Sequence, residues 1–187
     1  MSNIGKFSKL ITNDISNGAA RAMLYGADFS KTDFKKNLIG IGSMYYDLNP
    51  CNKHLGKLQE SVKKHTIDTM KPINFNTIGV SDGITNGNFG MKYSLPSREL
   101  IADSIETMIM AHHYDGFILI PGCDKNLPAA MMSMGRINRP SILLYGGTIL
   151  PGNYKGKDVD IVDAFESYGK LMNNNISNAD REDLLKV

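Results

Sequence analysis

Short apolar runs alternate with longer amphipathic segments through most of the chain, and this alternation limits the fold more than any other feature. The runs with strand character are residues 37–44 (NLIGIGSM), 73–80 (INFNTIGV), 116–120 (GFILI) and 140–145 (PSILLY). The segments with apolar residues at helical spacing are 54–70, 94–113 and 128–138. Such an alternation predicts right-handed crossovers in a parallel sheet. We therefore expect an α/β fold, an open, mainly parallel sheet with helices on both faces.

The first strand and the two ends of the chain have features of their own. Gly40 and Gly42 alternate with isoleucines, so one face of that strand should allow a close approach. Residues 19–25 (AARAMLY) are expected to form a short helix, and residues 161–172 carry apolar side chains at the spacing of another. A last helix is expected to begin near residue 177, where a serine precedes an aspartate by three positions.

Composition excludes several classes of protein. A chain of 187 residues with 42% hydrophobic and 21% charged residues is typical of a globular protein with a substantial core. A net charge of +2 is too small to indicate a basic surface for nucleic acid. No apolar run approaches the roughly 18 residues of a membrane span. The start of the chain lacks the apolar core of a signal peptide. Two widely spaced cysteines predict a reducing compartment, the cytoplasm by default, with an organelle left open.

Five residues with metal-binding or acid–base chemistry follow the predicted strands. Cys51 follows the first strand, Asp82 follows the second, and Cys123, Asp124 and Lys125 follow the third. Because parallel strands end at the same edge of a sheet, the topology places all five at one edge. Sites in open α/β proteins are built at this edge.

The five residues combine soft and hard ligands. Thiolates suit zinc, copper or an iron–sulfur cluster, and carboxylates suit magnesium or manganese. Taken singly, each residue has a simpler explanation: a buried cysteine, a turn aspartate at Asp82, a helix cap at Asp124 and a solvated Lys125. Their joint placement favours a site for two metals of different hardness.

Other polar residues give weaker signals. Residues 81–90 (SDGITNGNFG) and 151–159 are expected to be loops, and the glycines of the first could cradle an anion, although it is neither a P-loop nor a dinucleotide fingerprint. Arg98 and Glu99 either pair or are solvated. His112 lies on the predicted apolar stripe of its helix and is expected in the core. His54, close to Cys51 in sequence, either faces the site or does not.

Four stretches then identify a resemblance. They are NPCNKHL (49–55), FNTIGVSDGITNGNFGMKYSLPSRELIADSIE (75–106), CDKNLPAAMM (123–132) and RPSILLYGGTILPG (139–152). In them the chain resembles the N-terminal part of the dihydroxy-acid dehydratase family, which also includes sugar-acid dehydratases such as phosphogluconate dehydratase. With a weaker match over 19–25, the resemblance covers nearly the whole chain. The stretches SMYYDLNPCN and GMKYSLPSRE look more like the enzyme of branched-chain amino-acid (isoleucine/valine) biosynthesis.

The resemblance implies a reaction and a set of ligands. The family dehydrates a 2,3-dihydroxy acid to a 2-oxo acid through an enol, with an iron–sulfur cluster as Lewis acid and magnesium (Mg²⁺) at the substrate carboxylate. Its first two cluster cysteines match Cys51 and Cys123, and its magnesium aspartates match Asp82 and Asp124. Its carbamylated lysine matches Lys125. The resemblance also implies a homodimer, without nucleic-acid or membrane partners.

The resemblance also implies parts beyond this chain. In the family a third cluster cysteine, a further magnesium ligand and the serine thought to be the catalytic base lie in a later segment and a C-terminal β-rich domain. Residues 1–187 are therefore expected to be an iron–sulfur/magnesium-site domain, inactive alone, with the cluster open between 2Fe–2S and 4Fe–4S. Ala129 and Met44 stand where smaller residues are usual. The alternatives are an inactive remnant, a metal-binding or interaction module, and a sugar-acid dehydratase.

Overall fold

The computed structural model describes residues 5–187 and divides the chain into two units, Met1–Thr148 and Ile149–Val187. The larger unit contains a four-stranded sheet in the order β2-β1-β3-β4. The strands are β1 (Leu38–Ser43), β2 (Lys71–Asn76), β3 (Gly116–Ile120) and β4 (Ser141–Leu143). Every neighbouring pair in this sheet is parallel, as the alternation predicts.

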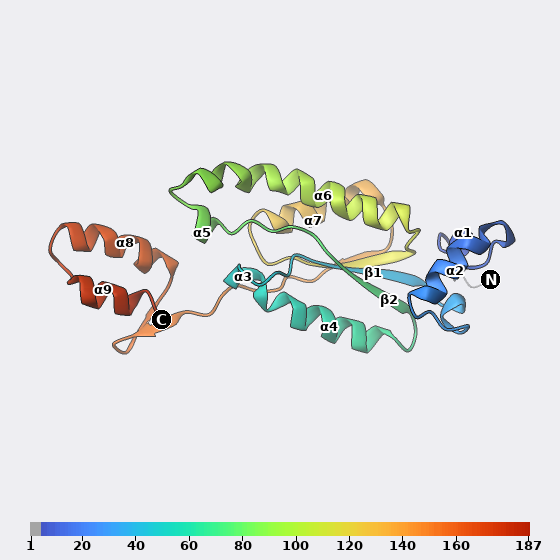
Figure 1. Cartoon of the computed structure of the whole chain (residues 1–187), viewed down its shortest axis with the longest axis horizontal. Helices are drawn as coiled ribbons and strands as arrows, with labels where there is room; N and C mark the ends of the chain where they lie inside the picture. Colours follow the sequence, from blue (N-terminus) through green and yellow to red (C-terminus); the bar gives the residue numbers. More distant parts are fainter. Residues whose placement is uncertain (1–4) are drawn as a thin grey trace. The chain divides into compact units, whose positions relative to one another are not determined.

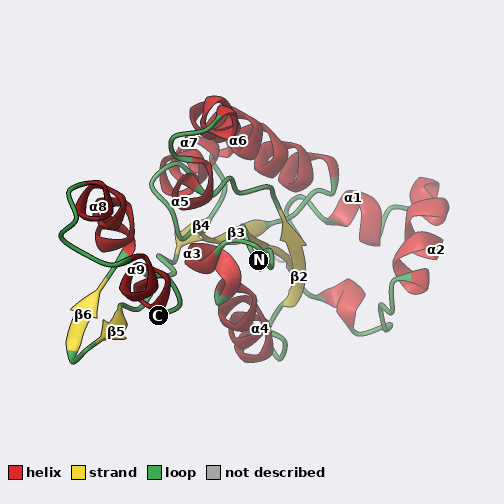
Figure 2. Cartoon of the chain, turned by 60° about the vertical axis from the view of Figure 1, so that its left-hand side comes forward, coloured by secondary structure: helices red, strands yellow, loops and turns green. Residues whose placement is uncertain are grey.

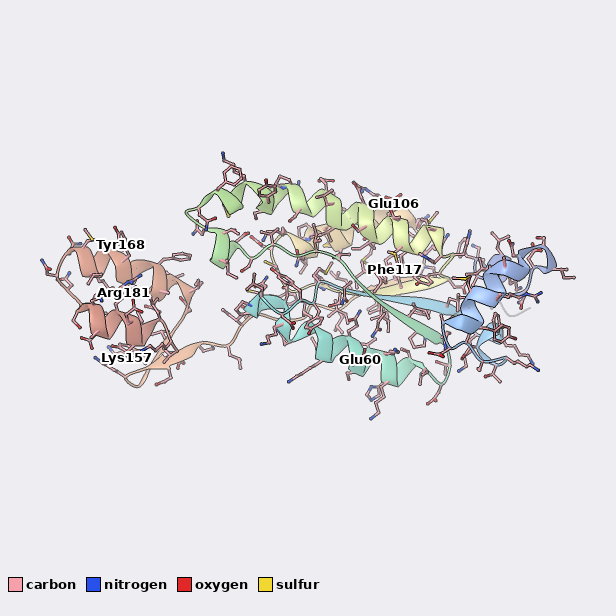
Figure 3. All side chains as sticks on the ribbon, viewed as in Figure 1. Glu60, Glu106, Phe117, Lys157, Tyr168 and Arg181 are labelled. Atoms are coloured by element: carbon pink, nitrogen blue, oxygen red, sulfur yellow. The ribbon has the colours of Figure 1, made fainter. Side chains whose placement is uncertain are left out.

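Helices cover both faces of the sheet. One face carries α4 (Leu55–Thr66), and the other carries α6 (Ser94–Ala111) and α7 (Asn126–Ile137) (Figure 1). The turned view separates the same two layers (Figure 2). Phe117 lies in the sheet layer and is buried, whereas Glu106 lies on α6, in the helical layer (Figure 3). The predicted α/β architecture with helices on both faces is confirmed.

The glycines of β1 bring neighbouring side chains close to the backbone. A Cβ atom at Gly40 would lie 2.7 Å from Ile109 Cδ1, and one at Gly42 would lie 2.7 Å from both Phe75 Cζ and Leu119 Cδ2. These distances are shorter than real Cβ contacts, so a larger residue would force the core apart. The close approach predicted for this face is confirmed.

The apolar stripe of α6 differs in part from the prediction. Ile101, Ile105 and Ile109 form this stripe and are fully buried. Leu100 is exposed because it lies about 100° around the helix from Ile101. His112 is also exposed, and the prediction that it lies in the core is wrong: it follows the last residue of the helix, and its Nδ1 lies 3.0 Å from a backbone oxygen of the last turn.

Three segments near the candidate ligands differ from the prediction. The second strand ends at Asn76, because Asn76 pairs with the last residue of β1 and later residues have no neighbouring strand. The expected loop at 81–90 contains the short helix α5 (Asp82–Thr85) and leads into the 3₁₀ helix η3 (Phe89–Tyr93). Cys51 lies in the short helix α3 (Pro50–Lys53) rather than in a loop.

The N-terminal part of the larger unit packs at the amino ends of the strands. It contains α1 (Lys9–Thr12), η1 (Ile15–Asn17), α2 (Gly18–Gly26) and η2 (Asp33–Lys35). The helix predicted at 19–25 corresponds to α2. Asp115, buried just before β3, accepts hydrogen bonds from the backbone of Phe7, Ser8 and Leu38 and from Ser8 Oγ. One carboxylate therefore ties the N-terminal segment to the sheet.

The smaller unit pairs a hairpin with two helices. The hairpin consists of β5 (Gly152–Tyr154) and β6 (Lys157–Val159), so the loop predicted at 151–159 is wrong. Lys155 and Gly156 both have positive φ angles, which suit the two-residue turn of a hairpin. The two predicted helices are confirmed as α8 (Ile161–Met172), which carries Tyr168 (Figure 3), and α9 (Asn178–Leu184), capped by Ser177. Among residues 5–187, no helix is long and apolar enough to cross a membrane.

Candidate metal centre

Lys125 is the centre of the candidate site. Its ammonium nitrogen Nζ lies 2.7 Å from Asp82 Oδ1 and 3.5 Å from Asp124 Oδ1. It also donates to the carbonyl of Val80 at 3.1 Å and lies 3.6 Å from Cys123 Sγ. The Lys125 side chain is 1% exposed, whereas Asp82 is 29% and Asp124 79% exposed. The structure therefore brings four of the five predicted residues together at the carboxyl edge of the sheet.

The turn after β3 brings the fifth residue to the same edge. β3 ends at Ile120, and the chain turns through Pro121 and Gly122 before α7 begins. A Cβ atom at Gly122 would lie 3.0 Å from the carbonyl oxygen of Cys51, so α3 packs directly against this turn. Asn49 accepts a hydrogen bond from the Cys51 amide at 3.1 Å and fixes the start of α3. Both cysteines are half-buried and free.

Asp82 is oriented from a second direction. It is the first residue of α5, and its Oδ1 accepts a hydrogen bond from Ser94 Oγ at 2.5 Å. Ser94 is the first residue of α6 and is buried. The carboxylate is therefore held between Lys125 and the start of the long helix. The parallel topology predicts Asp82 at this edge, but no motif points to Ser94.

The charges of the cluster support one another. Burial disfavours the ammonium form of Lys125, but the hydrogen bond to Asp82 and the nearby Cys123 and Asp124 groups outweigh burial and raise its pKa. Burial likewise acts to raise the pKa of Asp124, yet the hydrogen bond from Cys123 and the charge of Lys125 lower it. Burial and the hydrogen bond to Asp124 raise the pKa of the Cys123 thiol. The Lys125 ammonium is thus surrounded by hydrogen-bond acceptors.

Tyr46 is a site residue that sequence reasoning missed. Burial is the main cause of the raised pKa of its half-buried hydroxyl; Asn49 and Lys125 act to lower that pKa, and Cys123 and Cys51 act to raise it. Tyr46 is therefore within electrostatic reach of both thiols and the amine. A tyrosine in an irregular segment has no motif, and its position shortly before Cys51 was the only signal.

The other polar residues singled out in the sequence make contacts of their own in the fold. His54 Nε2 lies 2.6 Å from the carbonyl oxygen of Gly146, so this ring ties the start of α4 to the segment after β4. Arg98 and Glu99 form an exposed pair at 3.4 Å. Ala129 is fully buried in the first turn of α7. Anion binding by the glycines of residues 81–90 stays a prediction.

The donor set fits a hard metal ion only if Lys125 changes its charge. Among the described residues, no three His, Cys, Asp or Glu side chains come together closely enough to hold a metal ion. Asp82 and Asp124 instead share the Lys125 ammonium, which would repel a metal cation. A carbamate on Lys125 would replace that cation with an anionic oxygen ligand between the two carboxylates. Because the neighbouring carboxylates raise the pKa of Lys125 and favour its ammonium form, this modification would first require the loss of the ammonium proton.

Comparison with known proteins agrees with the family resemblance of the sequence. Residues 36–187 match the family described as dihydroxy-acid/6-phosphogluconate dehydratase N-terminal. The chain belongs to this family. The resemblance found in the sequence is thereby confirmed, and the match includes all five candidate ligands.

Relatives from bacteria and yeast match over almost the whole chain. The dihydroxy-acid dehydratase of Francisella tularensis subsp. tularensis (strain SCHU S4) is 51% identical over 184 residues, 98% of this chain and 33% of the relative. The mitochondrial dihydroxy-acid dehydratase of Saccharomyces cerevisiae is 50% identical over 193 residues, 98% of this chain and 32% of the relative. The dihydroxy-acid dehydratase of Lactococcus lactis subsp. lactis (strain IL1403) is 52% identical over 179 residues, which are 95% of this chain and 31% of the relative. The chain thus spans about a third of the length of the curated relatives it matches.

Proposed function

We propose that this chain forms the N-terminal metal-site part of a dihydroxy-acid dehydratase, a hydro-lyase that converts a 2,3-dihydroxy carboxylic acid to a 2-oxo acid. The observation that carries the proposal is the buried Lys125 amine between Asp82 and Asp124, with Cys123 beside it. The relatives are named dihydroxy-acid dehydratases, which favours a simple dihydroxy acid over a sugar acid, and we take its role to be in branched-chain amino-acid biosynthesis. The sugar acid is kept as the second candidate because the family description includes 6-phosphogluconate.

Carbamylation of Lys125 is the first step that the geometry supports. The Lys125 ammonium would first lose one proton; the neutral amine would then attack carbon dioxide, form a nitrogen–carbon bond and release a second proton. The product is an anion, so Asp82, Asp124 and the carbamate would offer three oxygen ligands of the kind that magnesium prefers. Ser94 would keep the Asp82 carboxylate in place through its 2.5 Å hydrogen bond.

Cys51 and Cys123 are the proposed soft ligands. They are held on separate segments, α3 and the turn after β3, which contact each other through the Cys51 carbonyl. When bound, an iron–sulfur cluster would supply a Lewis acid for the departing hydroxyl, and magnesium would supply positive charge for the substrate carboxylate. The chain has no other cysteine, so we propose that the further part present in the relatives supplies the remaining ligands and the base.

A chimera tests the proposal. Residues 36–187 would replace the corresponding segment of the Lactococcus lactis relative, and formation of 2-oxo acid would be measured with a branched 2,3-dihydroxy acid and with 6-phosphogluconate. We expect activity with the branched acid and a loss of about 10²-fold or more with Lys125→Ala or Asp82→Asn. Lys92→Ala, in which an exposed lysine is removed, should stay fully active.

Each outcome of the chimera separates the candidates. A folded, cluster-loaded chimera that is inactive on both acids would overturn the dehydratase proposal and favour a remnant or a metal-binding module. A preference for 6-phosphogluconate would replace the substrate class. The homodimer and the compartment stay predictions.

A further inference from the structure

Three fully buried asparagines stand next to the candidate ligands. Asn49 and Asn52 flank Cys51, and Asn126 follows Lys125. Three of their amide atoms have no hydrogen-bond partner within the described part of the chain: Asn52 Oδ1 and both amide atoms of Asn126. A buried amide without a partner is costly, and an apolar side chain of similar size would avoid that cost. Their concentration beside the ligands therefore needs an explanation.

Asn52 touches all three segments that carry candidate ligands. Its Nδ2 donates to the carbonyl of Met44, just past the end of β1, at 3.1 Å. The same Nδ2 lies 2.8 Å from the place that a Cβ atom at Gly79 would occupy, in the segment after β2. Its Oδ1 lies 3.3 Å from the corresponding place at Gly122, in the turn after β3. One buried amide thus lies where the three segments meet.

Asn126 approaches the same place from α7. Its Nδ2 lies 3.3 Å from the Cβ place at Gly79, so two amides converge on one glycine. A side chain at Gly79 would collide with both amides. Because glycine has no Cβ, the segment that leads to Asp82 can pack closely against Asn52 and Asn126. The Asn52 and Asn126 amides are therefore packed between the segments and not merely beside them.

We propose that Asn52, together with Asn126, is a positioning residue of the metal centre. The two amides hold the segments after β1, β2 and β3 against one another, so that both thiols, both carboxylates and Lys125 face a common ligand. The inference rests on the proposed function only in naming what the segments hold. The packing itself can be tested without any metal.

Hydrogen exchange of the metal-free 187-residue chain is the direct test. The variants are Asn52→Leu and Asn126→Leu, and the matched control is Gln59→Leu. Gln59 is also a buried amide and also joins segments, since its Nε2 donates to the carbonyls of Ile41 and Phe75 at 2.9 and 3.0 Å. It bridges β1 and β2 within the sheet, away from the cluster.

We expect Asn52→Leu to speed exchange about tenfold in residues 44–54, 77–82 and 121–126 together. Gln59→Leu should speed exchange in β1 and β2 and leave those three segments unchanged. Asn126 makes no side-chain hydrogen bond in the described chain, so Asn126→Leu should fold and affect 77–82 and 121–126 only. Faster exchange confined to 49–54, or spread evenly over the whole sheet, would overturn the inference, as would an Asn126→Leu variant that matches the wild type.

A spectroscopic measurement adds a readout that loss of stability alone does not move. Cobalt(II) would be titrated into each variant at a temperature where all are folded, and the thiolate-to-cobalt charge-transfer band recorded. Asn52→Leu should weaken binding about fivefold or more, and Gln59→Leu should bind like the wild type even if it melts at a lower temperature. Equal weakening by both would overturn the positioning role. Absence of the band in the wild type would count against the thiol ligands of the proposed function, while the exchange pattern would still decide the inference.

Discussion

Lys125 Nζ lies 2.7 Å from Asp82 Oδ1, although the two residues follow different strands and differ in exposure. The Lys125 amine is buried, whereas the Asp82 carboxylate is partly exposed to solvent at the carboxyl ends of the strands. A buried charge is stable only with partners, and here the Val80 carbonyl and Asp124 complete them. The proposed metal centre would therefore be organised around an amine that must lose its charge before a cation can bind.

Replacing this amine should destabilise the metal-free chain. Lys125→Met keeps most of the length of the side chain but removes the donor to the Val80 carbonyl and one of the two donors to Asp82, which keeps its hydrogen bond from Ser94. Because Asp82 keeps contact with water, we expect a moderate loss of about 1–3 kcal/mol in the free energy of unfolding, measured with urea. Lys92→Met is the control, since Lys92 is exposed. Equal stability of the Lys125→Met variant and the wild type would show that the cluster makes no net contribution before it is loaded.

Asp33 should make stability depend on pH in the acid range. Burial opposes its ionisation, but hydrogen bonds from Ser30 and the ion pair with Lys71 at 2.9 Å lower its pKa from 3.8 to about 2. Because the folded-state pKa is below the unfolded one, this stabilisation is complete above about pH 4 and is lost as the pH falls toward 2.

Asp33→Asn tests that dependence. It should cost about 1 kcal/mol at neutral pH, and the difference from the wild type should vanish near pH 2. Unfolding curves at a series of pH values would show this. Asp68→Asn, at an exposed position, should give no such trend. A constant difference between Asp33→Asn and the wild type from pH 7 to pH 2 would contradict the assignment.

Asp115 should decide whether the N-terminal segment stays attached. Asp115→Ala removes the acceptor of four hydrogen bonds, from Phe7, Ser8 and Leu38, and leaves buried donors unpaired. We expect a loss of about 2–4 kcal/mol and faster tryptic cleavage after Lys9. Asp115→Asn, which keeps one oxygen, should lie between this variant and the wild type. Unchanged cleavage after Lys9 in Asp115→Ala would mean that other contacts hold the segment.

Gly42 and Gly135 should respond in opposite directions to the same change. A Cβ at Gly42 meets Phe75 and Leu119 at 2.7 Å, so Gly42→Ala should cost about 1–3 kcal/mol. Gly135 lies in α7 with nothing within 4 Å of its Cβ place, so Gly135→Ala should stabilise the chain by about 0.5–1 kcal/mol. Denaturation of the two variants in parallel compares them. A stable Gly42→Ala variant would show that the core yields more easily than its distances indicate.

Much of the fold could be predicted because strong local signals agree with the tertiary contacts. β3 has the predicted bounds, since the apolar run of residues 116–120 is closed by Asp115 and Pro121. The end of β2 could not be predicted, because it depends on where its neighbour β1 stops. The hairpin at 152–159 was missed because its short strands are polar and only the turn at Lys155 and Gly156 distinguishes it.

The candidate site was also predictable only in part. The edge that carries Asp82 and Lys125 followed from topology, since parallel strands end together. Two residues near the site have no motif: Ser94, which orients Asp82, and Tyr46, whose pKa responds to the thiols and the amine. Both come from segments that only the folded chain brings near. The exposure of His112 escaped prediction because it depends on where α6 ends.

Detection of a carbamate on Lys125 is the measurement that tests the proposed metal centre most directly. The 187-residue chain would be equilibrated with ¹³C-labelled carbon dioxide, with and without Mg²⁺, and examined by ¹³C nuclear magnetic resonance. We expect a carbamate signal that Mg²⁺ strengthens, that disappears in Lys125→Arg, and that remains in Lys92→Arg. A wild-type chain without this signal, or a signal that persists in Lys125→Arg, would contradict the role assigned to the buried amine between Asp82 and Asp124.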